Sequence, residues 1–354
     1  MTHMNETMEK IISLCKRRGF IFQGSDIYGG LAGTWDFGPL GVELKNTIKR
    51  LWWEKFVTRR SDIYGVESAI LMNPKVWEAS GHVKLFSDPM TDCKKCKKRF
   101  RADKIDITKG CPNCGGKEFT EARPFTMMFK THAGPVEDSG SEVYLRPETA
   151  QGMFTNFKNV IDTFHPKLPF GIAQIGKAFR NEITPGDFIF RSREFEQMEI
   201  EYFVRENEWE KNFELWLSHM KEWIAFIGIQ NIHEREVSDV AHYSKRTVDI
   251  DYDFPFGREE LYGIAYRTDF DLKNHSDQST LNLSYTEDDG TKYIPHVIEP
   301  TFGVERTILA LLSESYEEQI LEKGDSRMVL HLKSYVAPVT VAVFPLVSNK
   351  EPIM

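Results

Sequence analysis

The sequence predicts an α+β fold in which antiparallel strands pack against helices, and three observations indicate it. Residues 170–203 have the pattern of two strands around a turn that contains Pro185-Gly186-Asp187, as in a β-hairpin. Residues 296–306 read as a short strand that passes through a glycine turn into the apolar helix 307–312. Apolar side chains recur at helical spacing over residues 209–227 and stop at Gly228, which is typical of an amphipathic helix packed on a core.

Two further segments have the character of strands. Val248, Ile250, Tyr252 and Phe254 alternate with aspartates, which predicts a half-buried strand. The run from Val336 to Leu346 is apolar and β-branched, although prolines interrupt it, and we expect one more strand there. Near the N-terminus, Cys15 lies on a predicted helix and is expected to be a small buried residue.

Four of the five cysteines form two Cys-x-x-Cys pairs, Cys93 with Cys96 and Cys111 with Cys114, with 14 residues between the pairs. This spacing brings four thiolates to one tetrahedral zinc. Disulfides are the alternative, but cytosolic thiols stay reduced. Since four cysteines leave no open coordination position, we expect a structural zinc ribbon over residues 88–122 that stabilises an insertion too short to hold its own core.

One face of the predicted hairpin is unusually charged for a sheet that is only structural. On the first strand one parity contains Gln174, Arg180 and Glu182, and on the second strand one parity contains Arg191, Arg193, Phe195, Gln197, Glu199 and Glu201. The alternate side chains of the second strand, which include Met198, Ile200 and Tyr202 at its end, are expected to face the core. A solvated sheet face explains the charges but not Phe195 among them. Stacking of a base on an aromatic ring is worth about 1–3 kcal/mol, and arginines pair bidentately with phosphate oxygens, so this face indicates an adenine nucleotide site.

The strand that begins at residue 296 has a matching polar face. Alternation places Glu299 and Thr301 on one side, next to Arg306 at the start of the helix. A carboxylate, a hydroxyl and an arginine together suit a metal-bound polyphosphate. The alternative is an ordinary strand-to-helix turn with a surface arginine, and the charged hairpin favours the nucleotide site over it.

The composition restricts the possible classes of protein. The chain has 354 residues, 41% of them hydrophobic, which is enough for one large domain with appendages. No apolar run approaches the ~20 residues of a membrane span, and residues 1–10 have no signal-peptide pattern. We therefore expect a cytoplasmic protein without membrane contact. The net charge of −8 argues against non-specific binding of polyanions, so any contact with nucleic acid must be local.

These segments carry a family resemblance. Residues 179–182 (Phe-Arg-Asn-Glu) followed by residues 191–195 (Arg-Ser-Arg-Glu-Phe) resemble motif 2 of the class II aminoacyl-tRNA synthetases, and residues 296–306 resemble their motif 3. Their motif 1, a long helix followed by a strand with a proline at the dimer interface, corresponds to Pro39–Val57 and Glu67–Pro74. Longer blocks resemble the homodimeric glycyl-tRNA synthetases: Tyr28–Gly41, Arg146–Gly152, Ala241–Ser244, Phe254–Gly257 and Gly263–Leu272.

The resemblance implies a domain organisation. A class II catalytic domain, with a mixed and mostly antiparallel sheet flanked by helices, would occupy residues 1–324. Motifs 1, 2 and 3 would lie at about 39–74, 170–203 and 293–312, with the zinc ribbon inserted between the first two. Residues 325–354 would form a linker and the first strand of an α/β anticodon-binding domain that is otherwise missing from this sequence.

The resemblance also implies an activity. It predicts a ligase that activates glycine with ATP and Mg²⁺, releases pyrophosphate and transfers glycine to the 3′ end of tRNA(Gly), working as a homodimer. Arg180 would bridge the glycine carboxylate and the α-phosphate. The adenine would lie between Phe195 and Arg306, with Arg306 also reaching the γ-phosphate. The remaining implied roles are Arg191 on the phosphate tail, Glu182 at the adenine amino group, Glu299 on Mg²⁺, and Glu148, Glu199 and Thr301 on glycine.

Three positions depart from the family pattern: Thr301 stands for the usual serine, Tyr266 for asparagine and Arg258 for a common tryptophan. Two other function classes stay open, an adenylate-forming paralogue for another small amino acid and a non-catalytic nucleotide-binding regulatory subunit. The block 146–152 argues against the first and intact motifs 2 and 3 argue against the second. The basic residues around the first cysteine pair suit either the tRNA acceptor arm or a solvated face.

Overall fold

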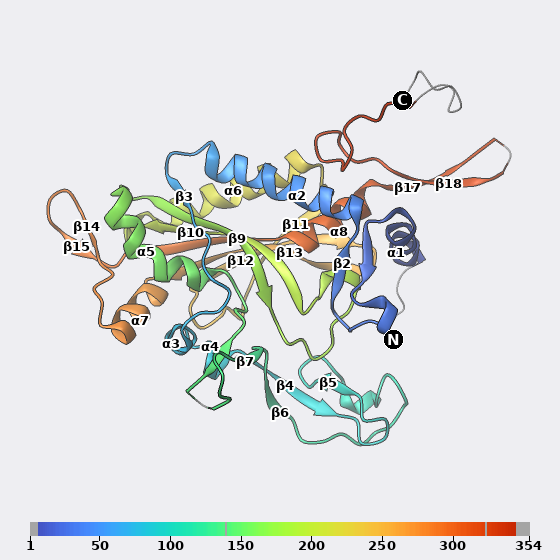
Figure 1. Cartoon of the computed structure of the whole chain (residues 1–354), viewed down its shortest axis with the longest axis horizontal. Coiled ribbons are helices and arrows are strands. Elements are labelled where there is room, and N and C mark those ends of the chain that lie inside the picture. Colours follow the sequence, from blue (N-terminus) through green and yellow to red (C-terminus); the bar gives the residue numbers. More distant parts are fainter. Residues whose placement is uncertain (1–5, 139, 323, 345–354) are drawn as a thin grey trace.

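The computed structural model of the protein describes residues 6–138, 140–322 and 324–344 (Figure 1). Its helices are α1 (Glu6–Arg18), α2 (Pro39–Trp53), α3 (Pro74–Ala79), α4 (His82–Leu85), α5 (Ala150–Phe164), α6 (Trp209–Ile227), α7 (Phe270–Ser279) and α8 (Val304–Ser315). The central sheet consists of β3 (Ile63–Gly65), β9 (Phe170–Phe179), β10 (Glu194–Val204), β11 (Ile232–Glu236), β12 (Arg246–Phe254), β13 (Gly257–Thr268) and β16 (His296–Gly303).

The smaller sheets lie around this body. They contain β1 (Ile21–Gln23) with β2 (Trp35–Phe37), β4 (Ser87–Asp92) with β5 (Arg99–Arg101) and β6 (Arg123–Thr126), β7 (Lys130–His132) with β8 (Glu142–Tyr144), β14 (Tyr285–Thr286) with β15 (Lys292–Tyr293), and β17 (Tyr316–Ile320) with β18 (Ser326–Leu330).

The central sheet is mixed and mostly antiparallel, as predicted. Its strand order is β11-β12-β13-β16-β10-β9-β3, and only the β3–β9 pair is parallel. The register places Glu199 opposite Gln174 on β9 and opposite Thr301 on β16. Residues that are far apart in the sequence therefore meet on three adjacent strands.

The two faces of the sheet have different surroundings. Met198, Ile200 and Tyr202 belong to the larger hydrophobic core, which β10 shares with α2, α6 and α8. Phe203 belongs to a second core cluster that includes side chains of α5. Since side chains alternate along a strand, Glu199 and Glu201 share the face of Phe203. The part of this face that α5 and α7 leave uncovered holds the polar site.

Several predicted elements are confirmed. The amphipathic helix is α6, which ends at Gly228 in a left-handed conformation with φ of 96°. The half-buried strand is β12, and the long helix of motif 1 is α2, which continues as a π-helical turn over Glu54–Thr58. Cys15 is fully buried, and burial raises the pKa of its thiol to about 12.

The hairpin of motif 2 is confirmed, but its strands are shorter than predicted. Strand β9 ends at Phe179 and β10 begins at Glu194, so Arg180, Glu182, Arg191 and Arg193 lie in the connection between them. We call residues 180–193 the motif 2 loop. The loop folds back because residues 188–190 form a buried 3₁₀ turn, which takes the backbone out of the ladder.

The prediction of a motif 1 strand at Glu67–Pro74 is wrong. The strand of this region is β3, which ends at Gly65, and Pro74 begins α3. Segment 67–73 has a single backbone bridge, from Leu71 to Leu145, and is otherwise held by side chains. Arg146 Nη1 donates to the backbone oxygen of Ser68 at 2.9 Å, and Ser68 Oγ donates to Gln174 at 2.8 Å.

The C-terminal expectations also need correction. Strands β17 and β18 form a hairpin across the expected boundary at residue 324, so a division there would cut a paired unit. The strand expected at Val336–Leu346 is not formed over its described part, which ends at residue 344. The backbone of Val336 and Ala337 bonds to Lys333 in a turn, and Val343 is 91% exposed, because no neighbouring strand offers a ladder to the described residues. Residues 345 and 346 lie outside the described residues.

None of the helices in the described part of the chain has the length and apolar character that a membrane crossing requires.

Candidate active site

Two adjoining cavities open on the polar face of the sheet. The larger has a volume of about 280 Å³ and is lined by the motif 2 loop, β13 and the start of α8. The smaller has a volume of about 240 Å³ and lies over β10, β12, β13 and β16. Arg180, Gln197, Glu260 and Thr301 line both cavities. A ligand in one cavity would therefore meet a ligand in the other at Arg180.

The larger cavity collects the residues that the sequence assigns to ATP. Arg180, Glu182, Arg191, Phe195 and Arg306 all line it. Their arrangement is that of a nucleotide pocket, with an aromatic ring, several guanidinium groups and a carboxylate around one space. Glu299, in contrast, lines the smaller cavity.

Arg306 is held in place before any ligand binds. Its Nη1 donates to the backbone oxygen of Glu260 at 2.8 Å and lies 3.1 Å from the Glu260 carboxylate. The guanidinium lies 4.4 Å from the centre of the Phe190 ring. The Arg306 charge lowers the pKa of Glu260, so the pair stays ionised. Glu260 and Phe190 thus position Arg306, and neither was assigned a role from the sequence.

The motif 2 loop is braced by the N-terminal segment around residue 33. Gly33 has φ of 74°, and a Cβ atom there would lie 2.5 Å from Pro185, so only glycine permits this approach. Arg193 fixes the contact, because its backbone N–H donates to Gly33 at 2.7 Å and its Nη1 donates to Ala32 at 2.7 Å. Arg193 therefore supports the loop and does not line the larger cavity.

Arg180 is oriented by the neighbouring backbone. Its Nε donates to the Pro147 carbonyl at 3.0 Å, and its guanidinium lies 5.3 Å from the Phe195 ring centre. The remaining guanidinium nitrogens are left for ligands at the junction of the cavities. Burial raises the pKa of Glu182, which lies 3.9 Å from Arg191 Nη1.

The smaller cavity holds the three residues assigned to glycine. Glu199 is 2% exposed and accepts hydrogen bonds from the hydroxyls of Thr149 and Thr301, the latter at 2.8 Å. Burial, and then the charge of Glu148, raise the pKa of Glu199. A small cation would be favoured here because buried carboxylates need compensation.

The pKa of Glu148 shifts in the opposite direction to that of Glu199. Burial alone would raise its pKa, but His82, 3.2 Å away, Arg267 and a hydrogen bond from Gln151 outweigh burial and lower the pKa. Glu148 is therefore an anion at neutral pH. Gln151 also donates to Asp271 at 3.0 Å, so the floor of the cavity is one connected network.

Arg267 is the cation of that network. It is 1% exposed and forms a bidentate pair with Asp271, both bonds 2.8 Å, and a third bond of 2.8 Å to Glu299. Burial nevertheless raises the pKa of Glu299 to about 8. The pattern of residues gave no separate signal for Arg267 or Asp271, although both lie in the block Gly263–Leu272.

Glu201 was not assigned a role and is the least compensated group of the site. It is fully buried, and neither carboxylate oxygen has a hydrogen-bond partner among the described residues. Its carboxylate lies within 4.8 Å of oxygens of Glu199 and Glu299. Burial, and then the charge of Glu299, raise the pKa of Glu201 well above its usual range. The site therefore has an excess of carboxylates, which suits an ammonium group or a metal cation.

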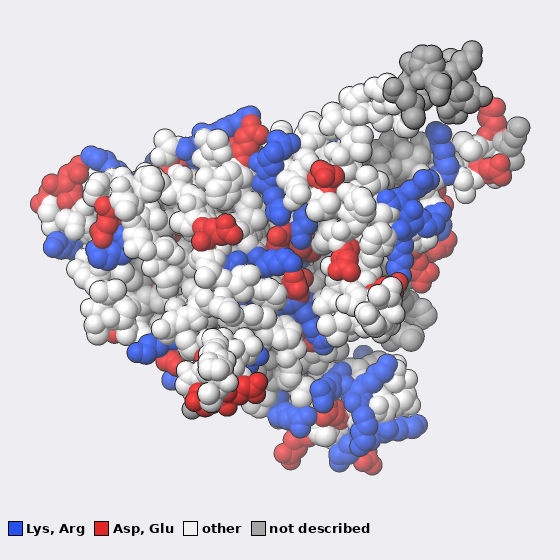
Figure 2. All heavy atoms as spheres, in the orientation of Figure 1, with Lys and Arg blue, Asp and Glu red and all other residues white. Residues whose placement is uncertain are grey.

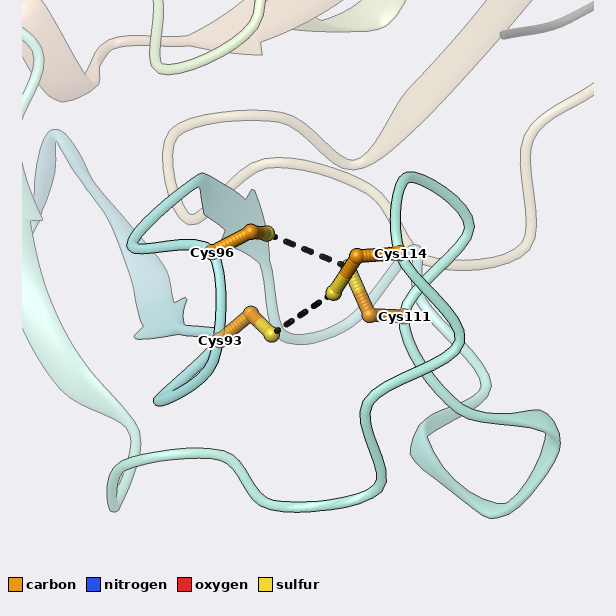
Figure 3. Close-up of side chains that lie close together, drawn as sticks. All are labelled: Cys93, Cys96, Cys111 and Cys114. Atoms are coloured by element: carbon orange, nitrogen blue, oxygen red, sulfur yellow. Dashed lines mark hydrogen bonds between the residues drawn. The ribbon is translucent and has the colours of Figure 1, made fainter.

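The cysteines of the insertion converge in space (Figure 3). The Sγ atoms of Cys93 and Cys114 are 3.7 Å apart, as are those of Cys96 and Cys111. All four are free thiols, and 3.7 Å is far longer than a disulfide bond of about 2.05 Å. Four thiolates around Zn²⁺, with Zn–S distances of about 2.3 Å, have their sulfurs about 3.8 Å apart. The cluster therefore fits a tetrahedral metal ion.

The fold and the two cavities define the catalytic domain of a class II aminoacyl-tRNA synthetase, and comparison with known families agrees. The model of the tRNA synthetase class II core domain (G, H, P, S and T) matches residues 129–315. A second model, Origin-associated protein OapC, matches residues 91–140, which include the four cysteines. A Giardia lamblia prolyl-tRNA synthetase solved with prolyl-adenylate has the same fold, with a TM-score of 0.68 at 14% identity. The superposition covers 99% of this chain and 60% of that one.

Curated relatives narrow the family. A glycine–tRNA ligase of Caldanaerobacter subterraneus is 52% identical over 96% of this chain and 80% of its own length. A glycine–tRNA ligase of Geobacillus thermodenitrificans is 50% identical over 97% of this chain and 80% of its own length. The chain belongs to the glycine–tRNA ligase family and is an aminoacyl-tRNA ligase of class II.

Proposed function

We propose that the chain activates glycine with ATP to form glycyl-adenylate and then transfers the glycyl group to tRNA(Gly). The observation that carries this proposal is the position of Arg180, which lines both cavities. The glycine carboxylate must attack the α-phosphate of ATP, and both groups are anions. A guanidinium at their junction cancels charge where it develops, which is the largest contribution that a preorganised site makes.

The other residues of the larger cavity receive the nucleotide. Phe195 stacks on the adenine, and Arg306, held by Glu260, covers its other face and reaches the γ-phosphate. Arg191 binds the phosphate tail, and Glu182 accepts from the adenine amino group. This assignment is supported by their common cavity. No side-chain nucleophile is required, because positioning and charge compensation supply the catalysis.

Glycine would occupy the smaller cavity, with its ammonium group toward Glu148 and Glu199. Thr301, whose hydroxyl is fixed on Glu199, borders the space around the α-carbon. Its extra methyl group, relative to the serine of the family pattern, narrows that space. A larger amino acid is then rejected by steric exclusion, which requires no editing step.

Mg²⁺ bound with ATP would neutralise phosphate charge. Glu299 fits as one protein ligand, since Mg²⁺ commonly takes one or two carboxylates together with substrate phosphates. Its place in the smaller cavity, near Glu199 and Glu201, suits a substrate ammonium as well.

Pyrophosphate exchange measured across the amino acids tests the proposed activation step. Exchange that depends on glycine is expected. Exchange with another small amino acid would favour an adenylate-forming paralogue, and nucleotide binding without any exchange would favour a regulatory subunit.

We propose that the four cysteines bind one structural zinc ion. Metal analysis of protein purified without chelator is expected to find about one zinc per chain. Cys93→Ser is expected to lower the melting temperature, because a closed four-cysteine site contributes folding free energy to a small insertion. Lys95→Ala is the matched control, since Lys95 is exposed in the same turn and supplies no thiolate. Metal-free protein that melts at the same temperature as untreated protein would contradict the zinc site.

We propose that motif 1 forms a symmetric homodimer through α2. This helix exposes Arg50 and borders a surface cavity of about 450 Å³ that also contacts Trp53 and Ile175. An isologous interface of an obligate pair is expected to bury more than about 2,000 Å². Light scattering should therefore give twice the chain mass at micromolar concentration. A monomer with full exchange activity under these conditions would exclude an obligate dimer.

Contact with tRNA is proposed for the insertion. Figure 2 shows lysine and arginine side chains gathered over it, and Lys94, Lys95, Lys97, Lys98 and Arg99 are exposed. Such a local basic surface can bind a phosphate backbone although the chain is acidic overall.

We also propose that the protein is located in the cytoplasm. The residues after β18 are proposed to begin a separate anticodon-binding unit.

A further inference from the structure

The insertion supplies a residue to the nucleotide cavity. Arg101, at the end of β5, lines the larger cavity together with Arg180 and Arg191. In Figure 1 the sheet β5-β4-β6 lies beneath the connection between β9 and β10, with β5 closest to it. The sequence places Arg101 five residues after Cys96, among basic residues that otherwise resemble a solvated face.

Arg101 differs from those neighbours in its fixed orientation. It forms a bidentate pair with Asp103, with bonds of 3.2 Å from Nε and 2.8 Å from Nη2. Its Nη1 lies 2.8 Å from Asp88 on β4, and its side chain is only 21% exposed. Two carboxylates of the insertion thus hold this guanidinium at the edge of the cavity.

The net positive charge of the arginines that line the larger cavity is smaller than the negative charge of a bound ATP. A bound ATP brings about four negative charges. Arg306 is already paired with Glu260, and Glu182 lies near Arg191, so part of the positive charge is compensated within the protein. Glu182 also interacts with Arg101. Asp88 and Asp103 compensate part of the charge of Arg101 as well, but they occupy only three of its five N–H donors, so this fourth guanidinium still offers two donors to a triphosphate.

We propose that Arg101 binds the phosphates of ATP, and that the four-cysteine cluster positions it. This inference rests on the proposed activation of glycine by ATP. The first cysteine pair lies in the turn that joins β4 and β5, where the backbone N–H of Cys93 donates to Lys98 at 2.9 Å. The register of the two strands pairs Met90 with Arg101. A metal ion bound by the cysteines would fix this turn, and the turn would fix β5.

The test compares Arg101→Ala with Arg99→Ala in pyrophosphate exchange without tRNA. Arg99 lies on the same strand, but its side chain is 63% exposed and reaches Asp92. Arg101→Ala is expected to raise KM for ATP roughly 10-fold or more, as for the loss of a hydrogen bond to a charged group, while KM for glycine stays within about twofold. Arg101→Lys should recover part of the loss. Equal KM values for ATP in Arg101→Ala and Arg99→Ala would overturn the proposal.

The role of the cluster is tested with the full chain carrying Cys96→Ser. We expect KM for ATP to rise as in Arg101→Ala, while kcat at saturating ATP is retained. An unchanged KM for ATP in protein that has lost its metal would overturn the positioning role. A direct titration with ATP separates this inference from the proposed function. If the unmodified chain shows no exchange with glycine but Arg101→Ala still weakens ATP binding relative to Arg99→Ala, only the proposed function fails.

Discussion

Replacing Arg180 with alanine is expected to slow glycine activation about 10²–10³-fold, the loss typical of one preorganised charge donor. Arg180 lines both cavities and its Nε is fixed on the Pro147 carbonyl. The alanine variant therefore loses charge where two anions meet, and the other arginines of the larger cavity do not line the smaller one. Since this interaction strengthens in the transition state, kcat should fall together with kcat/KM.

Glycine-dependent pyrophosphate exchange measures this effect. Arg180→Lys should lie between the alanine variant and the unmodified chain, because a lysine keeps the charge but not the planar donor geometry. Arg327→Ala on β18 is the matched control, since Arg327 is exposed and bonds only locally, to Gln319. Exchange by Arg180→Ala within threefold of the unmodified chain, with intact folding, would refute the assignment of motif 2.

The parts of the fold that follow from local patterns could be predicted from the sequence. Strand β12 alternates apolar and acidic residues because one face is buried, and α6 repeats apolar residues because one side packs on the sheet. The motif blocks grouped the residues predicted to bind ATP, and all of them except Glu299 line one cavity. Each of these signals lies in a continuous segment.

The missed features depend on contacts between distant segments. The motif 2 loop leaves the ladder because residues 188–190 are buried in the core, which strand alternation does not encode. Val336–Leu346 has strand-like residues, but a strand also needs a neighbour, and the described part has a turn instead. Arg101 and Glu260 reach the larger cavity only through the tertiary arrangement.

The buried Arg267 should be the residue whose loss destabilises the fold most among the arginines of the site. Arg267→Met is expected to lower the free energy of unfolding by about 3–5 kcal/mol, the usual consequence of removing one partner of a buried ion pair. The substitution keeps much of the side-chain volume but leaves Asp271, which is 1% exposed, and Glu299 without their cation. Urea unfolding followed by tryptophan fluorescence measures the change.

Two variants show whether the unpaired carboxylates cause this loss. Arg258→Met removes an exposed arginine that pairs with Asp253, and the free energy of unfolding should not change measurably, because solvent screens such pairs. The double variant Arg267→Met/Asp271→Leu should be more stable than Arg267→Met alone, since one buried anion is removed along with the cation. The rings of Phe154 and Tyr243 lie 5.4 Å and 3.8 Å from the Arg267 guanidinium. If the double variant is as unstable as Arg267→Met, Arg267 stabilises the fold by packing against these rings and not by its charge.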